Sequence, residues 1–318
     1  MTFEPIYILD IVLIILLLML AFTALHNKHL QQSIFLFIVF GLATTLIWLR
    51  LKAPDVALAE AAIGSGVAGA LLLAALKDRH ANSNSASIAS SRPKWQILTT
   101  SYLVIGLGLT AAWAFIDARL NHDSPHIGLL VEQEIAMSGV SNPVTAVLLN
   151  FRAYDTLLEL AVLFAALVGV MSIAPARPTP QKAGIVLNQL IGWLSPLLII
   201  TAAYLLWIGA DSPGGAFQAG ALLAAAGIII RLSGKLNNLP SGIWLRLLSA
   251  GGLGIFLFVG LAVMANNNSM LQLPIQWNSS LILLIEIFAT LSIAVSLLLV
   301  YLAGRPTAWD LNKEKTDV

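Results

Sequence analysis

Long apolar runs separated by short polar segments dominate the chain. A helix needs about 20 mostly apolar residues to cross a bilayer, and runs of that kind occur nine times. They cover residues 6–25, 33–50, 55–76, 96–117, 153–173, 185–208, 214–232, 243–265 and 279–303. The pattern predicts an all-α polytopic membrane protein with about nine transmembrane helices. We expect the first run to be an uncleaved anchor, because no cleavage-like site follows it and another span comes at once.

The composition agrees with a lipid solvent. Hydrophobic residues make up 58% of the 318 residues, charged residues only 10%, and the mean hydropathy is +0.87. Soluble domains carry about 25% charged residues. The net charge of +1 argues against a nucleic-acid partner, and the absence of cysteine excludes disulfides and thiol chemistry. The five histidines are scattered over predicted loops, so we predict no metal site, no cofactor and no enzymatic activity.

Two changes in composition divide the chain into blocks of three, two and four helices. Residues 81–91 are rich in serine and asparagine, and residues 174–180 are rich in proline, which cannot continue a helix. The predicted parts are a three-helix block (1–80), a flexible linker (81–94), a two-helix block (95–174), a proline-rich linker (175–183), a four-helix block (184–304) and a tail (305–318).

Lysine and arginine predict the orientation in the membrane. Basic residues follow the third, fifth and seventh spans and recur in the tail, whereas the opposite side receives mostly acidic loops. We therefore expect the N-terminus outside and the C-terminus in the cytoplasm. Arg50 and Lys52, close to Asp55, depart from this pattern.

Four acidic residues lie inside predicted spans: Glu60, Asp155, Glu159 and Glu286. Burying an ionisable group at a helix centre costs at least ~2.5–3.5 kcal/mol, so each is a candidate for an ion or proton path. The alternative for each is a structural hydrogen bond or ion pair.

Glu60 precedes a run of small residues that includes Gly64, Gly66 and Gly69. Glycines weaken a helix, so a π-bulge or hinge is expected just past the glutamate. The same small residues also suit a tight packing face.

The fifth span begins with Asn142 and Pro143, a good N-cap and a good first-turn residue. They predict a helix of about 30 residues on which Arg152, Asp155 and Glu159 share one face. These three could exchange a proton or form a structural ion pair, and the sequence leaves both readings open.

Glu286 has no partner at helical spacing in its own span. It must pair with another helix or another chain, or stay protonated. With the predicted orientation, Glu60, Glu159 and Glu286 fall at a similar depth in the outer half of the membrane. We expect a lateral polar seam rather than a continuous pore through this chain.

The stretch GADSPGGAFQAG (209–220) separates the sixth and seventh spans. Asp211 or Ser212 is expected to cap the seventh helix, with Pro213 in its first turn. Gly214 and Gly215 leave bare backbone at the positive end of that helix. Close packing is favoured over ion binding as the role of this helical hairpin's tip.

These motifs resemble parts of Mrp-type multisubunit cation/proton antiporters. The stretch GADSPGGAFQAG is similar to the glycine-rich turn of their B subunit, with Pro213, Gly214, Gly215 and Phe217 matching; Ala210 replaces the family's histidine and Ala216 one of its glycines.

Two further stretches resemble the C-terminal part of the A subunit of the same antiporters. NPVTAVLLNFRAYDTLLELAVL and PDVALAEAAIGSG carry the matching residues Phe151, Arg152, Asp155, Thr156 and Glu159 in the first, and Asp55 and Glu60 in the second. In related membrane-bound hydrogenases these blocks occur as separate small subunits.

The resemblance implies a fused accessory subunit of a sodium/proton antiporter in a prokaryotic plasma membrane. It also implies other membrane subunits as partners, protons and sodium as the transported ions, and a place for the acids and Arg152 along the ion path. Two alternatives remain open from the sequence: the membrane arm of a redox-driven pump related to membrane-bound hydrogenase, and a structural subunit of an ion-coupled inorganic-carbon uptake complex.

Overall fold

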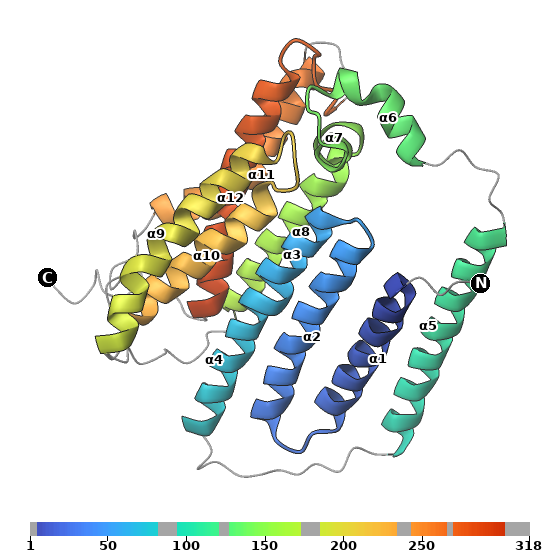
Figure 1. Cartoon of the computed structure of the whole chain (residues 1–318). Coiled ribbons are helices and arrows are strands. Elements are labelled where there is room, and N and C mark those ends of the chain that lie inside the picture. Colours follow the sequence, from blue (N-terminus) through green and yellow to red (C-terminus); the bar gives the residue numbers. More distant parts are fainter. Residues whose placement is uncertain are drawn as a thin grey trace, which may run out of the picture. The chain divides into compact units, whose positions relative to one another are not determined.

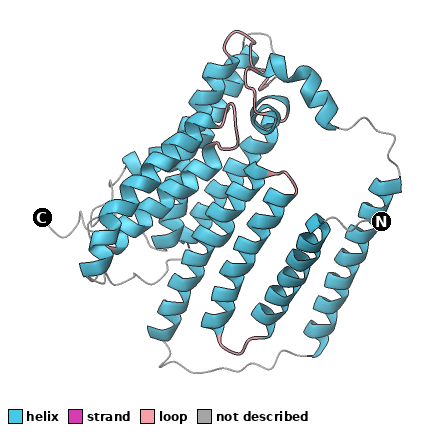
Figure 2. Ribbon diagram, viewed as in Figure 1, coloured by secondary structure: helices cyan, strands magenta, loops and turns pink. Residues whose placement is uncertain are grey.

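The computed structural model of the chain describes residues 5–81, 94–120, 127–172, 185–233, 243–265 and 270–302. Within these ranges the chain is helical and contains no strand (Figures 1 and 2). The α-helices are α1 (Pro5–His26), α2 (Leu30–Arg50), α3 (Pro54–Ala59), α4 (Ala68–Ala81), α5 (Lys94–Leu120), α6 (Ile127–Ser138), α7 (Pro143–Ala146), α8 (Ala153–Ser172), α9 (Ile185–Ile208), α10 (Ala216–Leu232), α11 (Ile243–Ala265) and α12 (Asn278–Leu302). Two π-helical segments, η1 (Glu60–Val67) and η2 (Val147–Phe151), join α3 to α4 and follow α7.

The predicted all-α polytopic class is confirmed. In the described ranges, eight helical stretches are long and apolar enough to cross a membrane. The ninth expected span, 214–232, corresponds to α10, which has 17 residues and is shorter than the other spans. The predicted linker at 175–183, the tail at 305–318 and most of the linker at 81–94 lie outside the described residues.

The chain forms two compact units. One consists of residues Arg79–Glu134 and contains α5, whose described side chains are all exposed. The other consists of Met1–Asp78 and Ile135–Val318 and contains all the remaining spans. The functional candidates all belong to this second, larger unit.

Helix α12 lies at the centre of the larger unit, where it packs against α8, α10 and α11. Its buried side chains, among them Ile282, Ile285 and Ile293, join Phe256 of α11 and Leu160 of α8 in one core. Small residues bring these helices close together: a Cβ added at Gly220 of α10 would lie 2.7 Å from the Ile293 side chain. This packing of small residues against α12 is typical of membrane helix interfaces.

The first helices pack in sequence, α1 on α2 and α2 on η1. An ion pair that the sequence pattern did not predict joins the first two: the Arg50 guanidinium donates to both carboxylate oxygens of Asp10, at 2.7 and 3.2 Å. This pair explains why Arg50 departs from the charge pattern of the loops, because its charge is neutralised within the larger unit.

Segment η1 confirms the π-bulge expected just past Glu60. Gly64 and Gly66 lower the preference for a regular α-helix, and the Ser65 hydroxyl donates to the Ala61 carbonyl at 2.8 Å. The helix therefore continues from α3 through η1 into α4 with a locally wider turn.

The fifth span begins as predicted but is not one regular helix. The Asn142 side chain caps it by accepting from the Val144 N–H at 2.9 Å, with Pro143 in the first turn. Segment η2 then ends in a bend at Arg152 (φ −130°, ψ 37°), and α8 begins at Ala153. The expectation of a continuous helix of about 30 residues is therefore wrong, because the chain widens and turns before α8.

The hairpin of α9 and α10 is confirmed, since the two helices pack along each other. The expected start of α10 is wrong: the helix begins at Ala216, and Gly215 rather than Asp211 or Ser212 occupies the N-cap position. Residues 209–215 instead form a loop in which Gly209, Gly214 and Gly215 are buried. Irregular backbone is tolerated in a membrane protein where other protein surrounds it, which is the case for this loop.

Candidate functional site

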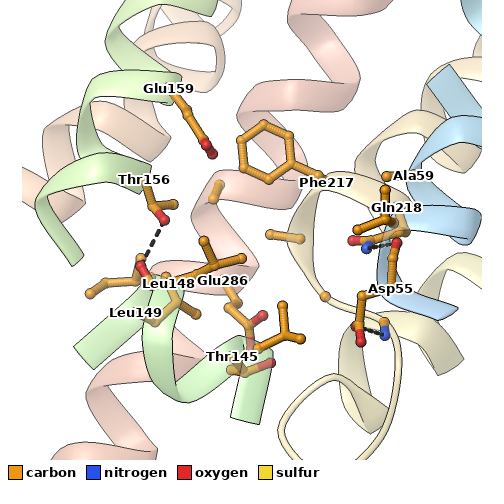
Figure 3. Close-up of a pocket in the computed structure, with 17 residues that line it drawn as sticks. Asp55, Ala59, Thr145, Leu148, Leu149, Thr156, Glu159, Phe217, Gln218 and Glu286 are labelled. Atoms are coloured by element: carbon orange, nitrogen blue, oxygen red, sulfur yellow. Dashed lines mark hydrogen bonds between the residues drawn. The ribbon is translucent and has the colours of Figure 1, made fainter. Parts of the chain in front are cut away.

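Three of the predicted acidic residues and the two glycines of the turn, Gly214 and Gly215, meet at one cavity of about 250 Å³ (Figure 3). Asp55 comes from α3, Glu159 from α8 and Glu286 from α12, and the loop before α10 closes the wall between them. The other lining residues are Val56, Ala59, Val144, Thr145, Leu148, Leu149, Thr156, Gly214, Gly215, Ala216, Phe217, Gln218, Ile285 and Ala289. Residues far apart in the sequence thus build one acidic cavity among apolar walls.

Glu286 is 3% exposed, and its carboxyl group lies beside Gly215, directly before the first residue of α10. The sequence leaves a partner on another helix, a partner on another chain and a protonated carboxyl open for Glu286, and the structure places it next to the start of α10. The free N–H groups and partial positive charge of a helix N-terminus favour a carboxylate at this position.

Gly215 allows this approach. Its φ of +114° is a conformation that L side chains rarely adopt, and a Cβ there would lie 3.2 Å from Oε1 of Glu286. The second glycine of the turn therefore serves both the backbone geometry and the contact with the acid.

Asp55 is buried on the other side of the same loop. Its Oδ1 accepts from the Gly214 N–H at 3.1 Å and from Nδ2 of Asn142 at 3.5 Å. The Asp55 carbonyl accepts from Nε2 of Gln218 at 3.2 Å. Asp55 thereby attaches the first helical block to the loop and to α10.

Asn142 and Thr145, at the start of α7, form hydrogen bonds to the loop before α10. The Asn142 amide donates to the carbonyls of Gly209 at 3.3 Å and Ser212 at 3.0 Å, while the Thr145 hydroxyl donates to the Gly209 carbonyl at 2.5 Å. These bonds satisfy carbonyls that the loop leaves without helical partners.

Glu159 lies on the wall formed by α8, and its carboxylate points toward Phe217 (Figure 3). Unlike Glu286 it is exposed, so this part of the cavity lining is open to the outside of the chain. The neighbouring Thr156 hydroxyl donates to the Leu148 carbonyl at 2.7 Å, eight residues earlier. This bond supports the widened turn that brings η2 and α8 to the same cavity.

Asp155 and Arg152 do not line this cavity. They form an ion pair of 2.6 Å in which both side chains are substantially exposed, 44% and 66%. Arg152 and Asp155 pair at the predicted i, i+3 spacing, although Arg152 itself lies in the bend before α8, and Asp155 and Glu159 are four residues apart on α8. Arg152 lines a second cavity of about 480 Å³ together with Asn150 and Asn278.

Glu60 faces α2 instead of the cavity. A Cβ added at Gly41 of α2 would lie 3.3 Å from Oε1 of Glu60, and one added at Gly64 would overlap the Glu60 carboxyl. The glycines next to Glu60 thus leave room for its side chain between α2 and η1.

Two predicted residues of the turn have other positions. Asp211 accepts a hydrogen bond of 2.6 Å from the Ser141 hydroxyl instead of capping α10, and Pro213 lies in the loop. Gly214, Gly215 and Phe217 line the cavity.

Sequence reasoning missed two residues of the site. The sequence pattern assigns no role to Gln218, although it lies within the turn, and it assigns Asn142 only a capping role. An amide within a glycine-rich turn between two apolar runs is the signal that points to Gln218, because such a group needs partners. Asn142 lies 67 positions before Gly209, and its sequence context does not connect it to the turn.

The arrangement is chemically suited to cations and protons. Its titratable lining residues are the three carboxylic acids, and no basic side chain is among the lining residues. In the described ranges, no three histidine, cysteine or acidic side chains are grouped closely enough to hold a metal ion. The site therefore offers separate carboxylates rather than a chelating cluster.

Comparison with protein families identifies two segments of the chain. Residues 15–80 match the MbhD family, described as the D subunit of MBH, and residues 186–304 match the "Domain related to MnhB subunit of Na+/H+ antiporter". The resemblance predicted from the motifs is confirmed, because one polypeptide carries both segments in this order.

Curated relatives include the A1 subunit of the Na(+)/H(+) antiporter from Staphylococcus aureus strains JH9 and Newman, each 28% identical over 182 residues. Each match covers 57% of this chain and 22% of the relative, so this chain spans about a fifth of the relatives' length. Relatives of this kind fit a transporter rather than an enzyme, and they do not favour the redox-driven alternative.

Two solved structures share the fold. A chain of the Mrp complex from Dietzia sp. DQ12-45-1b superposes with a TM-score of 0.73 and 21% identity, covering 94% of this chain and 35% of that one. A chain of an archaeal membrane-bound sulfane sulfur reductase superposes with a TM-score of 0.53 and 23% identity, covering 65% of this chain and 96% of that one. The chain is a multi-pass membrane protein with the fold of subunits found in such multisubunit complexes.

Proposed function

We propose that this chain is an accessory membrane subunit of a multisubunit Mrp-like sodium/proton antiporter and contributes intramembrane carboxylates to its ion path. The observation that carries the proposal is the convergence of Asp55, Glu159 and Glu286 on one cavity without a basic side chain in its lining. Acids kept at such a solvation cost inside membrane helices mark ion and proton pathways.

The two glutamates have complementary positions. Glu159 lies where the cavity opens and can exchange protons or a cation with the outside of the chain. Glu286 lies deep, at the start of α10, and the cavity of about 250 Å³ between them has room for several waters, each of which takes up about 30 Å³ in the liquid. A carboxylate–water–carboxylate connection of this kind supports proton transfer.

The remaining acids extend the same function. Glu60, on the α2 side of η1, supplies a further ionisable group next to the first block, and Asp155 lies one helical turn from Glu159. Arg152 compensates the charge of Asp155 through their ion pair. Asp55 contributes to the acidic lining and fixes the loop before α10.

The setting of this function is the plasma membrane of a prokaryote. The chain has its N-terminus outside and its C-terminus in the cytoplasm, and it acts with antiporter-like and small Mrp-type membrane subunits. The match to A1-type relatives covers about a fifth of their length, so the transport activity is proposed for the assembled complex.

The test is sodium-dependent proton movement in everted vesicles that contain the whole complex, followed with a pH-sensitive dye. Glu60→Gln, Glu159→Gln and Glu286→Gln each keep the shape of the side chain but cannot exchange a proton. We expect losses of about a hundredfold for Glu159→Gln and Glu286→Gln, in the range seen when a proton-transfer group is removed. Glu132→Gln, at an exposed position of α6, is the matched control and should behave as the wild type.

Assembly of the complex is checked by co-purification of the partner subunits with each variant. If all three glutamine variants assemble and exchange sodium for protons at the wild-type rate, the acids are structural and the proposal fails.

A further inference from the structure

Two oxygen atoms converge beside Gly215 at the deep end of the cavity. A Cβ added at Gly215 would lie 3.2 Å from Oε1 of Glu286 and 3.7 Å from Oε1 of Gln218. Both oxygens therefore lie on the side of Gly215 that lacks a side chain, one from α12 and the other from α10.

Gln218 is held so that its oxygen is available to a ligand. Its Nε2 donates to the Asp55 carbonyl at 3.2 Å, which fixes the direction of the amide. The side chain is only 8% exposed, and no described residue donates a hydrogen bond to its Oε1. The amide oxygen therefore belongs to the lining of the cavity, where its acceptor lone pairs are open to a ligand.

The charge around this oxygen pair suits a monovalent cation. The titratable groups that face the cavity are Glu286 from α12, Asp55 from α3 and Glu159 from α8, and the lining contains no basic group. Asp55 is occupied by its hydrogen bonds to Gly214 and Asn142, and Glu159 lies on the opening side. One carboxylate and one neutral amide oxygen match the single charge and the oxygen preference of a hard cation.

We propose that Glu286 and Gln218 bind Na⁺ between their side-chain oxygens at the start of α10. This proposal rests on the antiporter function and identifies a binding site for the transported cation in this chain. The missing side chain of Gly215 provides the space beside both oxygens.

Glu286 and Gln218 would also be unable to bind Na⁺ while Glu286 carries a proton. A carboxylic acid that carries its proton offers no negative charge to Na⁺, so protonation of Glu286 releases the cation. Glu159, nearer the opening, then provides the group that receives or delivers the proton.

The experiment compares two substitutions of Gln218 in the whole complex. Both Gln218→Leu and Gln218→Glu remove the N–H that bonds to Asp55, but only Gln218→Glu retains an oxygen at the proposed site. Gln189→Leu, at an exposed position of α9, is the control for a loss of an amide. The readouts are the half-saturating Na⁺ concentration for exchange in everted vesicles and the shift in melting temperature of the purified complex on adding NaCl, against choline chloride.

For Gln218→Leu we expect the half-saturating Na⁺ concentration to rise about tenfold, as for the loss of one contact to a charged ligand, and the Na⁺-specific thermal shift to disappear. Gln218→Glu should bind Na⁺ at least as tightly as the wild type, and Gln189→Leu should match the wild type in both readouts. If Gln218→Leu does not assemble, Gln218→Glu alone decides: a raised half-saturating concentration overturns the proposal.

The two proposals fail in different ways. Wild-type half-saturation and thermal shift in Gln218→Leu, combined with lost exchange in Glu159→Gln, would remove the Na⁺ site but keep the antiporter function. A wild-type complex that does not exchange Na⁺ for protons would overturn both.

Discussion

Gly215 determines how closely Glu286 approaches the start of α10. Its backbone adopts a positive φ, and its missing side chain leaves the space in which the oxygens of Glu286 and Gln218 lie. One residue thus combines a conformational requirement with a steric one. Both requirements act against any other amino acid at this position.

We predict that Gly215→Ala destabilises the complex by about 1–3 kcal/mol, because alanine at φ +114° is strained and its Cβ would press against Oε1 of Glu286. Gly254→Ala is the control, since a Cβ at Gly254 of α11 would meet no neighbouring atom within 4 Å. The measurement is the melting temperature of the purified complex. Equal melting temperatures for the two variants would contradict the role assigned to Gly215.

The sequence predicts which acids are candidates for an ion or proton path, but not which of them line the same cavity. An acid inside an apolar run is informative because of its solvation cost, and Glu159 and Glu286 stand out on that basis. Side-chain direction depends on helical phase, and the π-helical segments change that phase by amounts that a regular pattern does not contain. For this reason the sequence groups Glu60 with the other acids although it faces α2, and the pattern does not indicate the partner of Asp10 in the first span.

The helices owe their positions around the cavity to irregular segments. Segment η1 follows α3, which carries Asp55, and the bend after η2 allows α8 to present Glu159. Asn142 joins these parts, because it caps α7 and donates to two carbonyls of the loop before α10. The loop is therefore fixed by a residue of another helical block.

We predict that Asn142→Ala lowers the stability of the complex by about 2–3 kcal/mol, because it removes the helix cap and leaves the carbonyls of Gly209 and Ser212 without their donor. Asn142→Ser can still accept from the Val144 N–H and should recover about 1 kcal/mol of this loss. The check is again the melting temperature of the purified complex. An alanine variant as stable as the wild type would mean that the loop does not depend on this residue.

Helix α10 is the exception among the nine expected membrane spans, because it is shorter than the others. Eight stretches in the described ranges reach the length and apolarity of a membrane span, whereas α10 has 17 residues and starts after a loop whose glycines are buried. The sequence predicts a span here because the apolar run includes residues that belong to the loop. Whether the chain changes sides at α10 decides the topology of everything after it.

Because the chain has no cysteine of its own, labelling of a single introduced cysteine shows on which side of the membrane that position lies. We predict that Ser212→Cys, before α10, reacts with a membrane-impermeant maleimide in intact cells. Ser233→Cys, after α10, should react only in everted vesicles. Labelling of both from the same side would show that α10 does not cross and would reverse the orientation proposed for the last two spans.

The hydrogen bond between Asp55 and Gly214 joins residues that are 159 positions apart. At roughly 5–20 residues per second of ribosomal synthesis, the partner of Asp55 emerges on the order of ten to thirty seconds after Asp55 itself. During insertion the aspartate must therefore remain near water or a temporary neighbour until its donors arrive, first the Asn142 amide and then the Gly214 N–H. A nascent chain stalled before residue 142 would leave this carboxylate without either donor and should be a preferred substrate for membrane quality-control proteases.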